Sequence, residues 1–188
     1  VHRDVKPSNI LVTTTGLPML SDFGIAKILV DAETVDLTTP GVGVGTPEYM
    51  SPEQARGHFV DARTDIYSLG VVLYEMITAH KPFQADTPMA VIWKLASEPL
   101  PRPRSFIPDL PEEVENVLLR ALEKDPDNRY PSMTAFARAM ENLLQTAAEG
   151  RTRRSLPAVK RSGLHLPLRP MLWGSVSLLA IAVLAIAG

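Results

Sequence analysis

The sequence predicts a mainly α-helical domain with a small β-hairpin at its front edge, followed by a basic linker and one membrane-spanning helix. Three observations predict this arrangement. Apolar residues recur at helical spacing over residues 64–143, two short apolar runs flank a threonine-rich turn, and residues 171–188 contain no charged side chain. The chain has 188 residues, enough for one good core, and its lack of cysteine excludes disulfides, cysteine-ligated zinc and thiol catalysis.

Charge is divided unevenly along the chain. The net charge is −2, but residues 151–170 contain six Lys and Arg and no acid. Residues 1–150 therefore hold the other 13 basic residues and all 21 Asp and Glu, a net charge of −8. An acidic globule argues against nucleic acid as a partner, whereas the basic strip favours an anionic membrane surface.

The first predicted element is the hairpin. The apolar runs at residues 10–12 and 17–20 flank residues 13–16, Thr-Thr-Thr-Gly, as the strands of a hairpin flank its turn. Pro18 cannot donate a backbone hydrogen bond, so its strand should lie at a sheet edge.

Five helices are predicted after residue 50. Ser51, Pro52 and Gln54 form a good helix start, with serine as N-cap and proline in the first position. Residues 64–79 are apolar on nearly every side, which is typical of a buried helix, and Asp65 near its start is expected to cap it. The others should run from Thr87 to about Ser97, from Pro111 to a break at Asp125-Pro126, and onward from about Ser132.

The stretch from His2 to Asn9 has the residue types that phosphoryl transfer requires. It places a carboxylate (Asp4), an ammonium (Lys6) and a carboxamide (Asn9) in one short loop. Such a reaction needs an acceptor for the attacking hydroxyl, a cation beside the transferring phosphoryl group and oxygen ligands for Mg²⁺. Asp22-Phe23-Gly24 follows after the hairpin and offers a second hard-oxygen ligand, so the hairpin should hold Asn9 and Asp22 near each other.

Further stretches appear in a fixed order: Gly45–Tyr49, Ser51-Pro52-Glu53, Asp65–Gly70 and, much later, Arg129. Together with the two stretches above, they resemble eukaryotic-like protein kinases, specifically the receptor-like, membrane-anchored serine/threonine kinases of bacteria. The resemblance covers residues 1–145 and implies the C-terminal lobe of a kinase domain. Because the chain opens inside a catalytic loop, the N-terminal lobe is expected upstream of this fragment.

The resemblance also implies roles for individual residues. Asp4 would orient the hydroxyl and accept its proton, Lys6 would neutralise the phosphoryl group, and Thr46 would support both. The cofactors would be ATP and Mg²⁺, or Mn²⁺ in its place, with Asn9 and Asp22 as the metal ligands. Nucleotide contacts are expected from Lys6, Ser8, Asn9, Leu11 and Asp22, although Leu11 is equally well explained as a core leucine. Structural roles are expected for Arg3, Phe23, Gly24, Glu53, Asp65 and Arg129. The resemblance implies an ion pair between Glu53 and Arg129, and it implies that Asp65 accepts hydrogen bonds from the backbone of the catalytic loop in addition to capping its helix.

Residues 25–46 are rich in Thr, Gly and Asp and match an activation segment. Thr38 and Thr39 are the candidate phosphorylation sites, and a phosphate on either would add about −1.5 to −2 charge that could pair with Arg3. The glycines at 41–45 superficially resemble a phosphate-binding loop, but they lack the preceding strand and following helix that such a loop requires.

The C-terminal part has a different composition. Residues 146–170 are expected to form a basic juxtamembrane linker rich in Pro and Arg, and residues 171–188 are expected to span the membrane, since a spanning helix needs ~17–25 residues. The basic strip before this segment predicts a single-pass protein of the cell membrane with a cytoplasmic kinase domain.

The predicted function is transfer of the γ-phosphoryl group of ATP to Ser or Thr of protein substrates, including the kinase itself, in transmembrane signalling. Lys6, two residues after Asp4, favours Ser/Thr over Tyr specificity, and the resemblance also implies homodimers. Residues 1–188 alone should be inactive, because the family's glycine-rich loop and strand lysine would lie upstream. Two alternatives remain: a membrane-tethered pseudokinase scaffold, and a small-molecule phosphotransferase of kinase-like fold.

Overall fold

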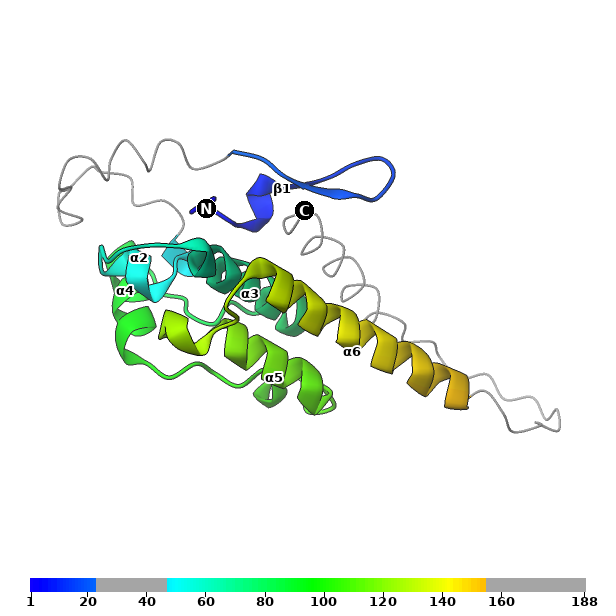
Figure 1. Ribbon diagram of the computed structural model, residues 1–188. Helices are drawn as coiled ribbons and strands as arrows, with labels where there is room; N and C mark the ends of the chain where they lie inside the picture. Colours follow the sequence, from blue (N-terminus) through cyan, green and yellow to red (C-terminus); the bar gives the residue numbers. More distant parts are fainter. Residues whose placement is uncertain (23–46, 155–188) are drawn as a thin grey trace.

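The computed structural model describes residues 1–22 and 47–154, without the side chains of residues 149–154. In this part of the chain, a helical body lies below a two-stranded hairpin (Figure 1). The strands are β1 (Ile10–Val12) and β2 (Pro18–Leu20), and the helices are α2 (Pro52–Ala55), α3 (Ala62–Thr78), α4 (Pro88–Ser97), α5 (Glu112–Ala121) and α6 (Met133–Arg154). Short 3-10 turns connect them: η1 (Pro7–Asn9), η2 (Pro47–Tyr49), η3 (Pro103–Ser105) and η4 (Pro126–Asn128).

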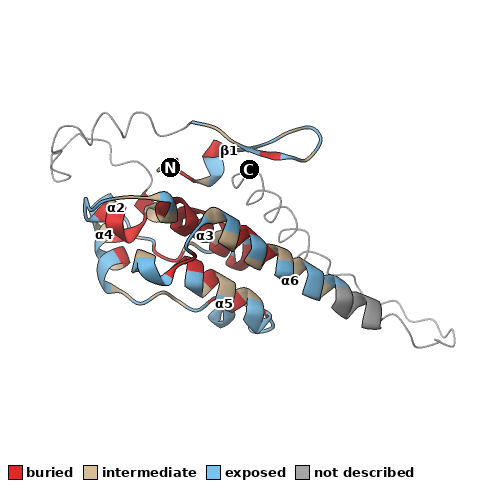
Figure 2. Cartoon of the chain, viewed as in Figure 1, coloured by how far each residue is buried: buried red, intermediate tan, exposed pale blue. Residues whose placement is uncertain are grey.

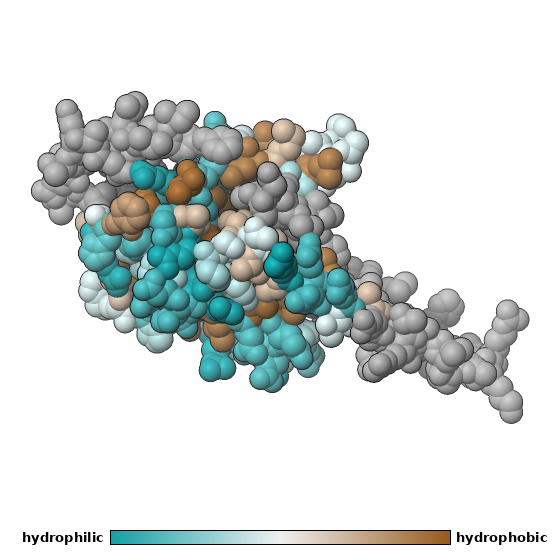
Figure 3. Space-filling model, viewed as in Figure 1, coloured by the Kyte–Doolittle hydropathy of each residue, from teal (hydrophilic) through white to brown (hydrophobic). Residues whose placement is uncertain are grey.

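The predicted hairpin is confirmed. β1 and β2 pair antiparallel with Leu11 opposite Met19, and Gly16 in the turn has a φ of 83°, a conformation that favours glycine. Among the described residues, Leu11 is 56% exposed, so the interpretation of Leu11 as a core leucine is wrong. The hairpin has four exposed apolar side chains, Leu11, Val12, Leu17 and Met19. Brown, hydrophobic surface is visible over the hairpin in Figure 3.

Helix α3 is the centre of the core, as its all-round apolar pattern predicts. It contacts η2, η3, α5 and α6, and most of its residues are buried (Figure 2). Gly70 lies where α3 meets α5, and a Cβ there would be 3.2 Å from the Cβ of Ala121. Glycine at this position therefore allows the two helices to approach closely.

The helix starts follow the predicted capping residues, with one exception. Ser51 and Gln54 form a reciprocal capping box at α2, and the hydroxyl of Thr87 accepts the N–H of Ala90 at α4. α3 begins earlier than predicted, because the carboxylate of Asp61 accepts the N–H of Arg63 and caps the helix. The capping role predicted for Asp65 is therefore wrong, whereas its predicted hydrogen bonds to the backbone of the catalytic loop are present.

The apolar stripes of the last two helices also lie as predicted. On α5, Leu118 is fully buried, and on α6 Phe136 and Met140 are buried against the same core. The stripe residues therefore join α5 and α6 to α3 in one continuous core.

Helix α6 is longer than predicted. It continues to Arg154, so residues 146–154, assigned to the linker, are helical instead. Alanine, glutamate and arginine in this stretch are good helix formers, and the first proline after it is Pro157. Among the described residues, no helix is both long and apolar enough to cross a membrane; the predicted spanning segment, residues 171–188, lies outside them.

Candidate active site

The loop before the hairpin is fixed to the start of α3 by one carboxylate. Asp65 accepts the backbone N–H of His2 at 2.7 Å and that of Arg3 at 2.8 Å. Arg3 has a φ of 66°, a conformation that costs free energy for a residue with a side chain. Two hydrogen bonds to a buried carboxylate offset that cost and fix the direction in which the chain enters Asp4.

Asp4 is the centre of the polar loop. The Nζ of Lys6 lies 2.9 Å from Oδ2 of Asp4, and the Nδ2 of Asn9 donates to Oδ2 at 3.0 Å and to the backbone carbonyl of Asp4 at 2.8 Å. The side chains of Asp4 and Lys6 are about a fifth exposed (22% and 21%), whereas Asn9 is buried. The structure thus brings the predicted carboxylate, ammonium and carboxamide together, with the first two open to solvent.

The hairpin connects Asn9 to the segment that contains Asp22. The N–H of Ser21 donates to the carbonyl of Asn9 at 2.8 Å, one pair beyond the strand pairing. Asp22 follows directly, is exposed and has a φ of 56°. The two predicted metal ligands therefore lie at the same end of the hairpin, where a backbone hydrogen bond joins Asn9 to Ser21, the neighbour of Asp22.

The donor atoms at this end suit a hard divalent cation. The amide nitrogen of Asn9 is bonded to Asp4, so its oxygen, 3.4 Å from the Ser8 hydroxyl, is the atom that a metal would use. The exposed carboxylate of Asp22 adds a second oxygen, 3.4 Å from the Ser21 hydroxyl. Mg²⁺ usually binds one or two protein oxygens and completes its shell with water and phosphate oxygens, so Asn9 and Asp22 fit it.

A second carboxylate–cation pair lies inside the protein. Arg129 and Glu53 form two parallel hydrogen bonds of 2.7 Å, with side chains 0% and 7% exposed. The Thr64 hydroxyl also donates to Glu53, and Arg129 donates further to the backbone carbonyls of Arg63, Glu123 and Lys124. The ion pair expected from the sequence is thus present, and it fastens α2 to the start of α3 and to the segment before α6.

Burial and hydrogen bonding oppose each other at Glu53. Burial raises the pKa of its carboxyl group, but the hydrogen bonds from Arg129 and Thr64 and the positive charge of Arg129 outweigh burial. The pKa therefore lies below its ordinary value, and Glu53 is ionised at neutral pH.

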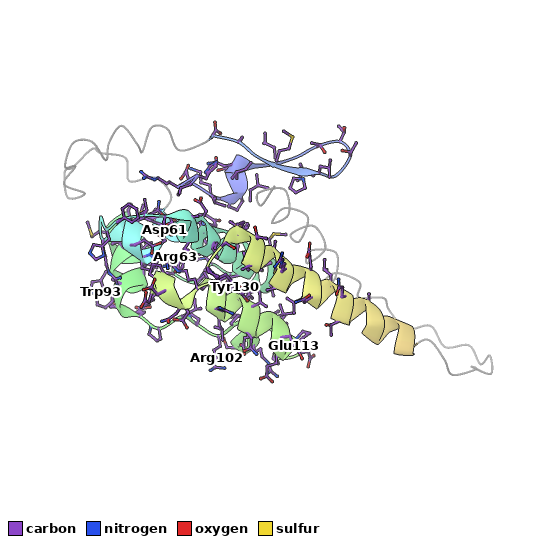
Figure 4. The ribbon with its side chains drawn as sticks, in the orientation of Figure 1. Asp61, Arg63, Trp93, Arg102, Glu113 and Tyr130 are labelled. Carbon is purple, nitrogen blue, oxygen red and sulfur yellow. The ribbon has the colours of Figure 1, made fainter. Side chains whose placement is uncertain are left out.

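An ion-pair cluster of Asp61, Arg63 and Asp127 lies at the first turn of α3, where Figure 4 labels Asp61 and Arg63. Arg63 lies 2.8 Å from Asp61, the helix cap, and 2.6 Å from Asp127 of η4. The hydrogen bond from Arg63 lowers the pKa of Asp61 more than partial burial raises it. This cluster connects the cap of α3 to the turn that precedes Arg129.

Several predicted site residues lie outside the described part of the chain: Phe23, Gly24, Thr38, Thr39 and Thr46. Their predicted roles stay predictions. Ser8 is exposed beside Asn9, and Leu11 is exposed on β1, so both are accessible to a ligand.

His2, at the start of the loop, and Gln54, in α2, have no functional role predicted from the sequence. The buried ring of His2 accepts the N–H of Asp4 at its Nδ1 (3.3 Å) and has its Nε2 3.0 Å from the carbonyl of Ser21. Gln54, predicted only as a capping residue, also donates to the carbonyl of Arg3 at 2.9 Å. No local sequence signal indicates either contact, because the partners are distant along the chain or are backbone atoms.

The sequence of this chain matches a known family. The family model described as protein kinase domain matches residues 1–142. The chain belongs to the protein kinase domain family. The kinase resemblance of the sequence is thereby confirmed, together with a mainly helical body and a two-stranded hairpin.

Curated relatives of this kinase domain include bacterial protein kinases. The chain is 46% identical over 150 residues to the tyrosine-protein kinase MasK of Myxococcus xanthus, which covers 80% of this chain and 23% of that protein. It is 47% identical over 131 residues to the serine/threonine-protein kinase PknB of Mycolicibacterium smegmatis, covering 69% and 21%. A probable serine/threonine-protein kinase of Streptomyces coelicolor is 41% identical over 152 residues, covering 81% and 22%. The chain spans about a fifth of the length of these relatives.

Proposed function

We propose that this chain contains the catalytic loop of a serine/threonine protein kinase that transfers the γ-phosphoryl group of ATP to protein hydroxyls. One observation supports this most strongly: Asp4 lies 2.9 Å from the ammonium of Lys6 and 3.0 Å from the amide of Asn9, beside the hairpin end that contains Asp22. These groups supply a base, a cation and two metal ligands in one place.

Each group has a distinct task in the proposed reaction. The carboxylate of Asp4 orients the substrate hydroxyl and takes its proton as the oxygen bonds to the γ-phosphorus and the bond to the β-phosphate oxygen breaks. Lys6 opposes the negative charge on the transferring group. Asn9 and Asp22 would hold Mg²⁺, which supplies neutralisation of the triphosphate charge when bound.

The choice of Ser and Thr over Tyr is part of the proposal. Two of the relatives described above are named as serine/threonine kinases, one of them as probable, and a third is named as a tyrosine kinase. Lys6, two residues after Asp4, supports the Ser/Thr choice. Phosphoamino-acid analysis of the autophosphorylated full-length protein should give phosphoserine and phosphothreonine; phosphotyrosine alone would contradict the choice.

The metal ligands provide the functional test. In the full-length protein, Asp22→Asn should lower phosphoryl transfer by at least about 100-fold at 1 mM Mg²⁺, because the site loses a charged ligand. If wild type binds nucleotide but transfers no phosphoryl group, the pseudokinase scaffold replaces the kinase proposal.

Residues 1–188 alone should show negligible turnover, and robust turnover by them would contradict the proposed need for an upstream lobe.

Membrane anchoring is a separate part of the proposal. It is supported by the uncharged residues 171–188 and the acid-free basic strip at 151–170. The full-length protein should remain in the membrane pellet after washing at pH 11, and a deletion of residues 171–188 should release it. Recovery of the intact protein in the supernatant would contradict a spanning segment.

A further inference from the structure

Gln54 uses both ends of its side-chain amide. Its oxygen accepts the N–H of Ser51 at 3.1 Å and the hydroxyl of the same serine at 3.2 Å, which completes the capping box of α2. Its nitrogen donates to the carbonyl of Arg3 at 2.9 Å, 51 positions earlier in the chain. A capping role requires only the oxygen, so the second hydrogen bond has no part in capping α2.

The carbonyl of Arg3 belongs to the peptide group whose N–H is that of Asp4. That N–H donates to Nδ1 of His2, so the peptide plane before Asp4 is held at its oxygen by Gln54 and at its nitrogen by His2. Rotation of this plane changes ψ of Arg3 and φ of Asp4, and it would therefore move the carboxylate of Asp4. Because Arg3 has a φ of 66°, the local backbone does not favour this arrangement by itself.

Helix α2 is a rigid support for this contact. Glu53, next to Gln54, is buried and bonded to Arg129 and Thr64. Two adjacent side chains of α2 thus make different contacts: Glu53 binds the helical body, and Gln54 binds the catalytic loop. We propose that Gln54 is a positioning residue for the phosphoryl-transfer reaction, which fixes the Arg3–Asp4 peptide through its amide nitrogen; this inference rests on the proposed kinase function.

One substitution separates the two uses of the amide. Gln54→Glu keeps an oxygen acceptor at the capping position but removes the donor and places a negative charge near the carbonyl of Arg3. In the full-length protein, kcat should fall at least about tenfold while KM for ATP changes by less than about twofold, since a displacement of about 1 Å can cost ~100-fold in rate. Hydrogen exchange of residues 2–6 should become faster, and exchange of residues 52–56 should not change.

Two further variants complete the test. Ser51→Ala removes the serine side of the capping box but keeps the Gln54 nitrogen, so it should lower Tm and leave kcat within about twofold of wild type. Gln54→Lys keeps a donor but no acceptor, so it should retain a higher kcat than Gln54→Glu.

The inference is overturned if Gln54→Glu has wild-type kcat, or if its exchange rates at residues 2–6 equal those of wild type. It is also overturned if activity follows Tm across the three variants, because Gln54 would then have only a structural role. The exchange measurement does not require activity. An inactive wild-type protein would therefore contradict the proposed kinase function while leaving the positioning contact separately testable.

Discussion

The protein contains two carboxylate–cation pairs that differ in their exposure. Asp4 and Lys6 are 2.9 Å apart with side chains about a fifth exposed (22% and 21%), and Glu53 and Arg129 are 2.7 Å apart with side chains 7% and 0% exposed. The buried pair has hydrogen bonds to Thr64 and to several backbone carbonyls, and removal of either partner would leave the other charge buried without its counter-ion. Solvent can reach the Asp4–Lys6 pair, as a substrate would need to. The difference in burial supports the proposal that the Glu53–Arg129 pair serves stability and the Asp4–Lys6 pair serves the chemistry.

The largest effect on stability is expected from breaking the buried pair. Arg129→Met leaves the Glu53 carboxylate buried without its partner, so the free energy of unfolding should fall by about 3–5 kcal/mol. Urea denaturation of the kinase domain measures this change. The double variant Glu53→Leu/Arg129→Met is the matched control and should recover much of the loss; a single-variant loss below about 1 kcal/mol would contradict the assignment.

The contact between α3 and α5 should be the next most sensitive. Gly70→Val places a branched side chain where even a Cβ would lie 3.2 Å from Ala121 and from Leu122. Overpacking of this kind costs about 1–3 kcal/mol, measured by the same denaturation. Gly70→Ala should cost less, because its gain in helix propensity, up to ~1 kcal/mol, offsets the crowding. Equal stability of Gly70→Val and wild type would show that the core has room to relax.

The pH dependence of stability should depend on the buried pair. Because the folded-state pKa of Glu53 is below its ordinary value of 4.5, the unfolded chain binds more protons in acid. The stabilisation is therefore complete above the unfolded pKa and is lost as pH falls below it and through the folded pKa. Urea midpoints between pH 7 and 3 should fall more steeply for wild type than for the Glu53→Leu/Arg129→Met variant. Parallel curves would contradict this cause.

The smallest effect is expected at the ion-pair cluster of Asp61, Arg63 and Asp127. Asp127 is 82% exposed although its oxygen is 2.6 Å from Arg63, so Asp127→Asn should cost less than about 1 kcal/mol. High salt should reduce even this difference, because exposed charges are screened. If Asp127→Asn lowered the free energy of unfolding as much as Arg129→Met does, exposure would not determine how much an ion pair contributes to stability.

Local patterns predicted the elements well. The capping serine and threonine at α2 and α4 and the apolar stripes of α3, α5 and α6 depend on residues close in sequence, and the structure contains each of them. Helix α6 extends past residue 146, the predicted start of the linker, because the change in composition there is not accompanied by a change in conformation. Arginine and alanine continue a helix as readily as the residues before them.

Contacts across the chain could be predicted only through the family resemblance. Of the two roles expected for Asp65, the cap of α3 belongs to Asp61 instead, whereas the hydrogen bonds to the backbone of His2 and Arg3 are present as the resemblance implies. The second hydrogen bond of Gln54 joins positions 51 residues apart, and no periodicity indicates it. The grouping of Asp4, Lys6 and Asn9 was predictable because all three lie within one short loop.

The central claim is that the Asp4–Lys6 pair serves the chemistry and the Glu53–Arg129 pair serves stability. Asp4→Asn tests it most directly, with kcat and the free energy of unfolding measured on the same full-length preparation. Asparagine keeps the size of the side chain but cannot accept the proton, so kcat should fall by about 10²–10⁴-fold. The free energy of unfolding should change by less than about 1 kcal/mol, since the pair is only partly buried and water can solvate the remaining ammonium. An unchanged kcat, or a loss of stability as large as that of Arg129→Met, would contradict the assignment of Asp4 to the chemistry.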